Sequence, residues 1–155
     1  MTINNRHVAI VGVGLIGRAW AAIFARAGWT VRLTDPHRPT LEAAPQLIRD
    51  ELHALARHGL ASDPDGAAAR ISIAASLAEA VKDVTFVQEN GPENVDQKTA
   101  IFSELDRLAP PDALLASSTS AIVASRFTEM LPGRARCLVG HPVNPPHLVP
   151  LVELC

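Results

Sequence analysis

The sequence predicts an α/β domain built on a doubly wound, mainly parallel sheet. Short apolar, β-branched segments alternate with longer amphipathic segments, which is the order of a parallel sheet with helices on both faces. The chain has 155 residues, of which 48% are hydrophobic, so it is long enough and apolar enough to bury one core. We therefore interpret residues 1–155 as a single domain.

The first expected unit is strand, helix, strand. Residues 7–11 form an apolar run that is typical of a strand buried on both faces. Over residues 15–27 the apolar positions recur with helical spacing, and Gly28 is a natural helix end. Residues 30–34 are a second strand, which Asp35-Pro36 terminates.

The remaining elements continue this alternation. A long helix over residues 41–58 has Pro45 as its weak point, and residues 60–70 are polar and rich in turn formers. The sequence Ser76-Leu77-Ala78-Glu79 fits a capping box that opens a short helix. The other expected strands are 71–74, 84–88, 113–117 and 137–140, and the other expected helices are 96–108 and 122–130.

Most polar features of the sequence fall at the predicted carboxyl ends of strands. They are Gly12, Asp35, Glu89, residues 117–120 and His141. Because the carboxyl ends of parallel strands share one edge of a sheet, and such folds bind ligands there, we expect these residues to form one site.

Composition excludes several classes of protein. With 14 basic and 16 acidic residues the formal charge is −2, which argues against a nucleic-acid or membrane partner. No apolar run approaches the roughly 18 residues of a membrane helix. Residues 6–21 could pass for a signal peptide, but three glycines and Arg18 interrupt that pattern. The two cysteines cannot form a disulfide framework, and no histidines have metal-ligand spacing, so we expect a cytoplasmic protein without a metal.

The strongest local motif is Gly12-Val13-Gly14-Leu15-Ile16-Gly17, which has the pattern G-x-G-x-x-G. Alone it could be only a tight strand–helix turn. Here a strand precedes it and a helix follows, which predicts a Rossmann-type dinucleotide-binding domain. The backbone N–H groups of the turn and the helix dipole would bind the phosphates. The cofactor contacts expected from this motif are Gly12, Gly14, Leu15, Ile16 and Gly17.

Asp35 supplies the second half of the dinucleotide signature. It follows the second strand, about 20 residues beyond Gly17, where a carboxylate can accept hydrogen bonds from a ribose 2′-hydroxyl. The same charge repels a 2′-phosphate, so NAD is favoured over NADP, although Arg38 lies close enough to weaken this preference. A flavin is the remaining competitor.

The second half of the chain resembles the 3-hydroxyacyl-CoA dehydrogenase family. His141-Pro142-Val143-Asn144-Pro145-Pro146, followed by Leu151-Val152-Glu153, resembles its H-x-x-N-P…LVE signature. Residues 117–120 (SSTS) and 88–94 (QENGPEN), with the downstream Lys98, are similar to two further segments of the family. The form of these motifs is closest to the λ-crystallin branch, which includes L-gulonate 3-dehydrogenase.

This resemblance implies roles for individual residues. His141 would be the catalytic base and Glu153 its orienting partner, with Ser120 near the reacting hydroxyl and the nicotinamide. Asn144 would lie beside the cofactor. Glu93 and Lys98 would contact its ribose side. A histidine suits the first role because its ordinary pKa is near neutral and a neighbouring carboxylate stabilises the imidazolium.

The resemblance also implies an activity, NAD-dependent oxidation of the 3-hydroxy group of a 3-hydroxyacyl-CoA or of a small 3-hydroxy acid similar to L-gulonate or carnitine. Fatty acid metabolism would be the setting for the thioester. Glu51 and His58 align with CoA-contacting serine and lysine positions, and a glutamate there would repel the CoA phosphates.

Family members are about twice as long and have a helical C-terminal domain. The resemblance therefore implies that the full-length protein is a homodimer and that the isolated domain is inactive. Two other hypotheses stay open at this point, a non-catalytic NAD-binding module and a structural protein of the crystallin kind.

Overall fold

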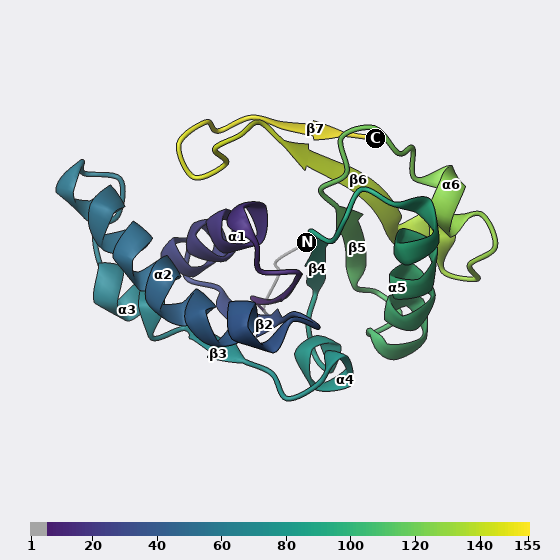
Figure 1. The fold of residues 1–155 in the computed structure, drawn as a ribbon, viewed down its shortest axis with the longest axis horizontal. Coiled ribbons are helices and arrows are strands. Elements are labelled where there is room, and N and C mark those ends of the chain that lie inside the picture. The colour runs from purple at the N-terminus through teal and green to yellow at the C-terminus, as the bar shows by residue number, and fades with distance from the viewer. Residues whose placement is uncertain (1–5) are drawn as a thin grey trace.

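The computed structural model describes residues 6–155, which form one seven-stranded sheet in the order β3-β2-β1-β4-β5-β6-β7 (Figure 1). Every neighbouring pair of strands is parallel except β6 and β7, which are antiparallel. The strands are β1 His7–Val11, β2 Thr30–Thr34, β3 Ile71–Ile73, β4 Phe86–Glu89, β5 Leu114–Ser117, β6 Cys137–Pro142 and β7 Val152–Leu154. The helices are α1 Leu15–Arg26, α2 Arg38–Arg57, α3 Pro64–Ala68, α4 Leu77–Val81, α5 Val95–Leu108, α6 Ser125–Thr128 and the 3₁₀ helix Arg134–Arg136.

The central strand β1 is buried on both faces of the sheet, as its unbroken apolar sequence predicts. Val8 and Ile10 belong to a core with α1 and α2, whereas Ala9 and Val11 belong to a second core with α4 and α5. In Figure 1, α1 and α2 lie on one side of the central strands and α5 lies on the other. The prediction of a doubly wound sheet is confirmed.

The chain reverses its direction of travel across the sheet between β1 and β4. From β1 it proceeds outward through β2 to β3, and it then returns to pair β4 with the other side of β1. The register places Val11 opposite Glu89, so the two strands end together. Such a switch point opens a crevice beyond the carboxyl ends of the strands, which is where ligands bind in this class of sheet.

Three of the expected elements differ in extent. Helix α2 begins at Arg38 because the imidazole of His37 accepts a hydrogen bond from Thr40 N and caps the helix, and it continues through Pro45. A short helix, α3, occupies residues 64–68 of the expected loop, because the Asp63 carboxylate caps it. The helix expected over 122–130 is reduced to α6.

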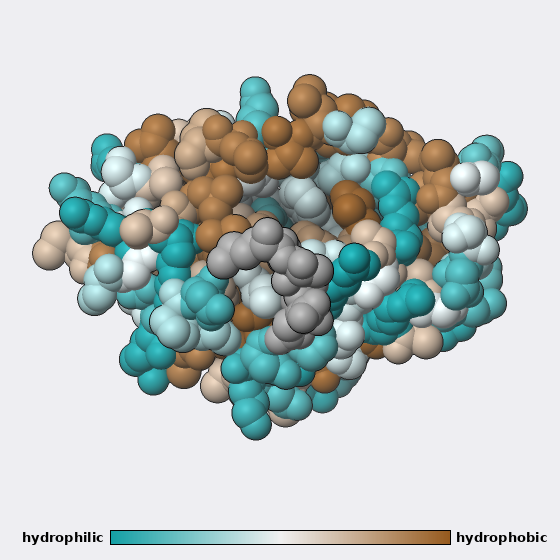
Figure 2. Space-filling model, turned by 180° about the vertical axis from the view of Figure 1, so that it is seen from behind, coloured by the Kyte–Doolittle hydropathy of each residue, from teal (hydrophilic) through white to brown (hydrophobic). Residues whose placement is uncertain are grey.

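Apolar residues are exposed to solvent in β7, in the connection that precedes it and on either side of α6. The exposed apolar side chains include Val123, Met130, Leu148, Leu151, Val152 and Leu154. Figure 2 shows hydrophobic surface gathered along the upper rim of the molecule, where Figure 1 draws β6 and β7. No helix within residues 6–155 is long and apolar enough to cross a membrane.

Candidate active site

A cavity of about 540 Å³ lies at the switch point between β1 and β4. The glycine-rich turn, the end of β2 and the start of α5 enclose it. Its lining residues are Val11, Gly12, Gly14, Asp35, Pro36, His37, Thr40, Glu89, Asn90, Gly91, Pro92, Gln97, Lys98 and Ile101. The cavity is therefore where the sequence places a cofactor.

The glycine-rich turn needs its first and third glycines for different reasons. Gly12 has φ of +83°, and its N–H donates to Thr34 O at 2.8 Å, which ties the turn to β2. A side chain on Gly17 would place a Cβ 1.9 Å from the carbonyl oxygen of Gly12, so only glycine allows α1 this close to the turn.

The middle of the motif faces open space. A Cβ on Gly14 would meet nothing within 4 Å, so a ligand can approach the backbone there. Leu15 opens α1 with its side chain 64% exposed, while Ile16 is half-buried against the core. The turn thus offers an accessible helix N-terminus next to a cavity, which is the arrangement that binds phosphate.

Asp35 lines the cavity and braces the glycine-rich turn. Its Oδ2 accepts a hydrogen bond from Val13 N at 2.8 Å, and its Oδ1 accepts one from His37 N at the same distance. Each carboxylate oxygen can accept a further hydrogen bond, so the side chain can still receive a ribose hydroxyl. The expected competitor Arg38 is engaged by Glu42, with Nε and Oε1 2.6 Å apart.

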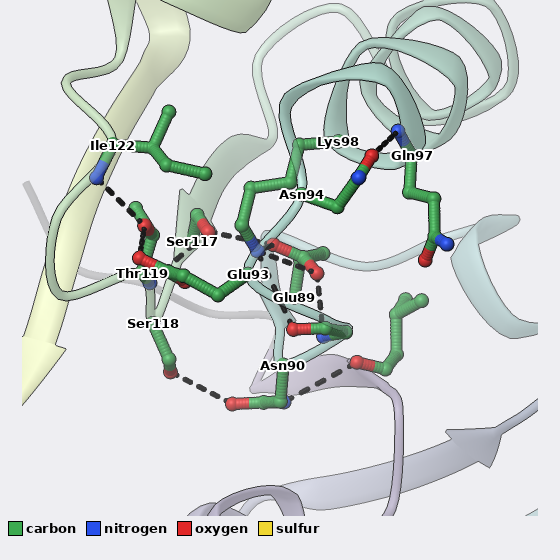
Figure 3. A network of polar contacts seen from close by, with 12 residues as sticks. Glu89, Asn90, Glu93, Asn94, Gln97, Lys98, Ser117, Ser118, Thr119 and Ile122 are labelled. Atoms are coloured by element: carbon green, nitrogen blue, oxygen red, sulfur yellow. Dashed lines mark hydrogen bonds and ion pairs between the residues drawn. The ribbon is translucent and has the colours of Figure 1, made fainter.

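The wall of the cavity contains a buried ion pair that the sequence did not reveal. Lys98 Nζ lies 2.9 Å from Oε2 and 3.2 Å from Oε1 of Glu89, and both side chains are 2% exposed. Ser117 Oγ also donates to the Glu89 carboxylate, at 2.6 Å. Lys98, expected at the ribose side of the cofactor, therefore lines the cavity with its charge already neutralised (Figure 3).

Glu93 is turned toward the loop after β5 and is not among the residues that line the larger cavity. Its Oε1 accepts hydrogen bonds from Thr119 Oγ1 at 2.6 Å, Ala121 N at 2.9 Å and Ser120 N at 3.1 Å. Burial alone would raise the pKa of this carboxyl, but these hydrogen bonds and the charge of Lys98 hold the pKa below its ordinary value.

A second, smaller cavity of about 130 Å³ contains the other predicted group. His141 Nδ1 and Glu153 Oε2 are 2.8 Å apart, because the antiparallel register of β6 and β7 places the two residues opposite each other. Ser120 lines the same cavity. The structure thus brings together the three residues that the sequence predicts as catalytic.

Asn144 is the predicted site residue that lies apart from the others. It is exposed in the connection between β6 and β7, and it lines neither cavity. Its expected place beside the cofactor stays a prediction.

A polar network centred on Ser118 lies beside the larger cavity, which two of its members, Val11 and Asn90, line. Ser118 Oγ accepts hydrogen bonds from Trp20 Nε1 at 3.0 Å and Gln88 Nε2 at 2.7 Å, and it donates to Asn90 Oδ1 at 2.7 Å. Asn90 Nδ2 donates in turn to Val11 O at 3.3 Å. Hydrogen bonds therefore connect α1, the end of β1 and the loop after β5, and Figure 3 shows the one between Ser118 and Asn90.

A dinucleotide fits the larger cavity. The open space over Gly14, the helix N-terminus behind it and the Asp35 carboxylate supply sites for a pyrophosphate and a ribose in the positions that a Rossmann-type domain uses. The fold and the cavity together define a dinucleotide-binding domain.

Comparisons with known proteins identify the family. Residues 7–155 match the model of the 3-hydroxyacyl-CoA dehydrogenase NAD-binding domain. The chain belongs to this family, and the cofactor of its domain is NAD.

Individual relatives match over almost the whole chain. The lambda-crystallin homolog of Rattus norvegicus is 41% identical over 95% of this chain and 47% of its own length. The L-carnitine dehydrogenase of Streptomyces coelicolor is 39% identical over 97% of this chain and 47% of its own length. The 3-hydroxybutyryl-CoA dehydrogenase structure of Escherichia coli K12 superimposes with a TM-score of 0.90, at 26% identity over 97% of this chain and 32% of that one. The chain therefore spans about half the length of the curated relatives it matches.

Proposed function

We propose that the full-length protein is an NAD-dependent dehydrogenase that oxidises the 3-hydroxy group of a small carboxylic acid, with His141 as the base. The observation that supports this most is the hydrogen-bonded pair of His141 and Glu153 in one cavity with Ser120. The domain that contains them binds NAD.

Oxidation of a hydroxyl group removes a hydride from its carbon atom and a proton from its oxygen atom. When bound in the larger cavity, NAD would supply the acceptor for the hydride that leaves the carbon atom. The hydroxyl proton must leave at the same time, and the free Nε2 of His141 accepts it, because Nδ1 faces Glu153. The carboxylate of Glu153 fixes the imidazole tautomer and stabilises the cation that forms. Ser120 contributes a hydroxyl that can hydrogen-bond the reacting oxygen.

A free acid is favoured over a CoA thioester by the charge on α2. Glu51 lies where the family resemblance expects a CoA contact, and its Oε1 is 2.6 Å from Nδ1 of His147. Burial raises the pKa of this carboxyl, and the charges of His147, Arg18 and Arg26 oppose that rise. When ionised, the carboxylate repels the phosphates of CoA. The relatives named L-carnitine dehydrogenase, at about 40% identity, favour the same class of substrate.

A turnover screen tests this proposal. The full-length protein would be assayed by NADH absorbance with NAD and three substrates, L-gulonate, carnitine and 3-hydroxybutyryl-CoA. We expect turnover of one of the free acids, with kcat/KM at least about tenfold above that of the thioester. Preferred oxidation of the thioester would overturn the substrate class. Binding of NADH without turnover of any 3-hydroxy compound would instead favour a non-catalytic or structural protein.

A further inference from the structure

In the loop after β5, residues 119–121 are hydrogen-bonded to a single carboxylate, that of Glu93. Glu93 precedes α5, and its Oε1 accepts hydrogen bonds from one side-chain hydroxyl and two backbone N–H groups of residues 119–121. Figure 3 shows Glu93 directed at Thr119 from the opposite side of the gap between α5 and this loop. Three donors on one oxygen are the geometry of an anchor.

The anchored segment closes on itself. Thr119 Oγ1 donates to Glu93 and accepts a hydrogen bond from Ile122 N at 3.1 Å, so the turn around Ser120 is closed. The start of the loop is fixed separately, since Thr119 N donates to Ser117 Oγ at 3.2 Å and that hydroxyl donates to Glu89. Glu89 therefore fixes the start of the loop, and Glu93 fixes the segment that contains Ser120.

The Ser120 side chain itself has no such support. Ser120 is exposed and lines the smaller cavity. Within residues 6–155, the only hydrogen bond of Ser120 is the one that its backbone N–H donates to Glu93. Its place in the cavity that it shares with His141 thus depends on the backbone of the turn. Because a displacement of about 1 Å can reduce the rate of a positioned reaction about 100-fold, the anchor bears directly on the chemistry.

We propose that Glu93 is a positioning residue, which acts through the backbone of residues 119–121 to place the Ser120 hydroxyl opposite His141. This inference rests on the proposed function. It gives Glu93 a task at the substrate end of the site, in place of the cofactor contact that the family resemblance implies, since Glu93 does not line the larger cavity.

A double-mutant cycle on the full-length protein tests the inference. Glu93→Ala should lower kcat about 10–100-fold and leave the Kd for NADH within about twofold. In a Ser120→Ala background the same substitution should change kcat less than about twofold, because the hydroxyl that it positions is already absent. Glu93→Gln keeps an acceptor oxygen and should recover most of kcat. Glu104→Gln, on the exposed face of α5, the helix that Glu93 precedes, is the matched control and should change neither constant.

Hydrogen exchange supplies a readout that does not depend on turnover. In Glu93→Ala the amides of Ser120 and Ala121 should exchange at least about tenfold faster, while those of Glu104→Gln should exchange as in the parent protein. Additive losses in the cycle, or a fall in NADH affinity as large as the fall in kcat, would overturn the positioning role. A His141→Ala variant that keeps its turnover would instead overturn the proposed function.

Discussion

The two cavities of this domain are built in opposite ways. In the wall of the larger one, Lys98 and Glu89 form an ion pair in which each side chain is 2% exposed. Around the smaller one the pair is open to solvent, with the side chain of His141 30% exposed and that of Glu153 65% exposed. The larger cavity therefore has a buried charged pair in its wall, whereas the pair in the smaller cavity stands at the edge of the sheet.

This difference separates two kinds of sensitivity to mutation. Removing one member of a buried ion pair leaves an uncompensated charge and destabilises the fold. An exposed pair contributes little to stability, about 0–1 kcal/mol, so its substitution changes chemistry and leaves the fold intact. Substitution of Lys98 or Glu89 should therefore affect folding and binding together, whereas substitution of His141 or Glu153 should affect turnover alone.

Gly17→Ala should have the largest effect. The new Cβ would lie 1.9 Å from the backbone oxygen of Gly12. Relief of this clash requires the backbone of α1 or of the glycine-rich turn to move. We expect a loss of about 3 kcal/mol or more in the free energy of unfolding, at the upper end of overpacking effects, and no measurable NADH binding. Thermal unfolding and a fluorescence titration check this.

Gly14→Ala is the matched control for that prediction. Its Cβ would enter open space, so the fold should keep its stability while NADH binding weakens through the side chain that now projects toward the phosphates. Equal loss of stability in both variants would contradict the assignment of different roles to the two glycines.

Most of the fold could be predicted from the sequence, because its central strands β1, β4 and β5 are largely buried. The prediction failed where a side-chain cap decided the outcome. The His37 imidazole begins α2 at Arg38, and the Asp63 carboxylate nucleates α3 inside a segment of turn-forming composition. Local hydrogen bonds of this kind leave only a weak signal in hydrophobic periodicity.

The site was predictable to the extent that its residues lie at strand ends or in known motifs. The family resemblance implied that Glu153 is the partner of His141, and the structure contains this contact because β6 and β7 pair the two residues. The bond between Lys98 and Glu89 was not foreseen, because it joins a helix to a strand end and periodicity gives no distance between them. The polar sequence Gln88-Glu89-Asn90 at the end of a buried strand was the available signal.

His141→Ala should show the second largest effect, and we expect it to change turnover and not cofactor binding. Loss of the base should lower kcat of the full-length protein about 10²–10⁴-fold. The Kd for NADH should change less than about threefold, because the phosphates bind at the glycine-rich turn. Glu153→Gln should give a smaller loss of kcat, since the imidazole keeps a hydrogen-bond partner and loses only the charge. Steady-state kinetics with an NADH titration measure both, and near-normal turnover in His141→Ala would contradict the mechanism.

Asp35→Ala should have a smaller effect, on the affinity and choice of the cofactor and on the turn that this carboxylate braces. We expect NADH to bind about tenfold more weakly, as for the loss of one charge-assisted hydrogen bond, and the preference over NADPH to narrow. Asp35→Asn separates charge from structure, because an amide oxygen can still accept one of the two backbone hydrogen bonds while the repulsion of a 2′-phosphate is gone. Calorimetric titration with both cofactors measures this, and equal affinities in the parent protein would remove the argument.

The two cysteines differ in burial, and the difference in their reactivity is the prediction with the smallest effect on function. Burial raises the pKa of the Cys137 thiol to about 11, with the charge of Asp106 adding to the rise and that of Arg136 opposing it. At pH 8 only about one molecule in a thousand then has the thiolate that reacts, whereas Cys155 is exposed. Iodoacetamide should therefore alkylate Cys155 at least about 100-fold faster, as peptide mass spectrometry would show, and both thiols should react in guanidinium. Comparable rates in the native protein would mean that β6 opens to solvent at Cys137 and that this end of the strand is not part of the buried core.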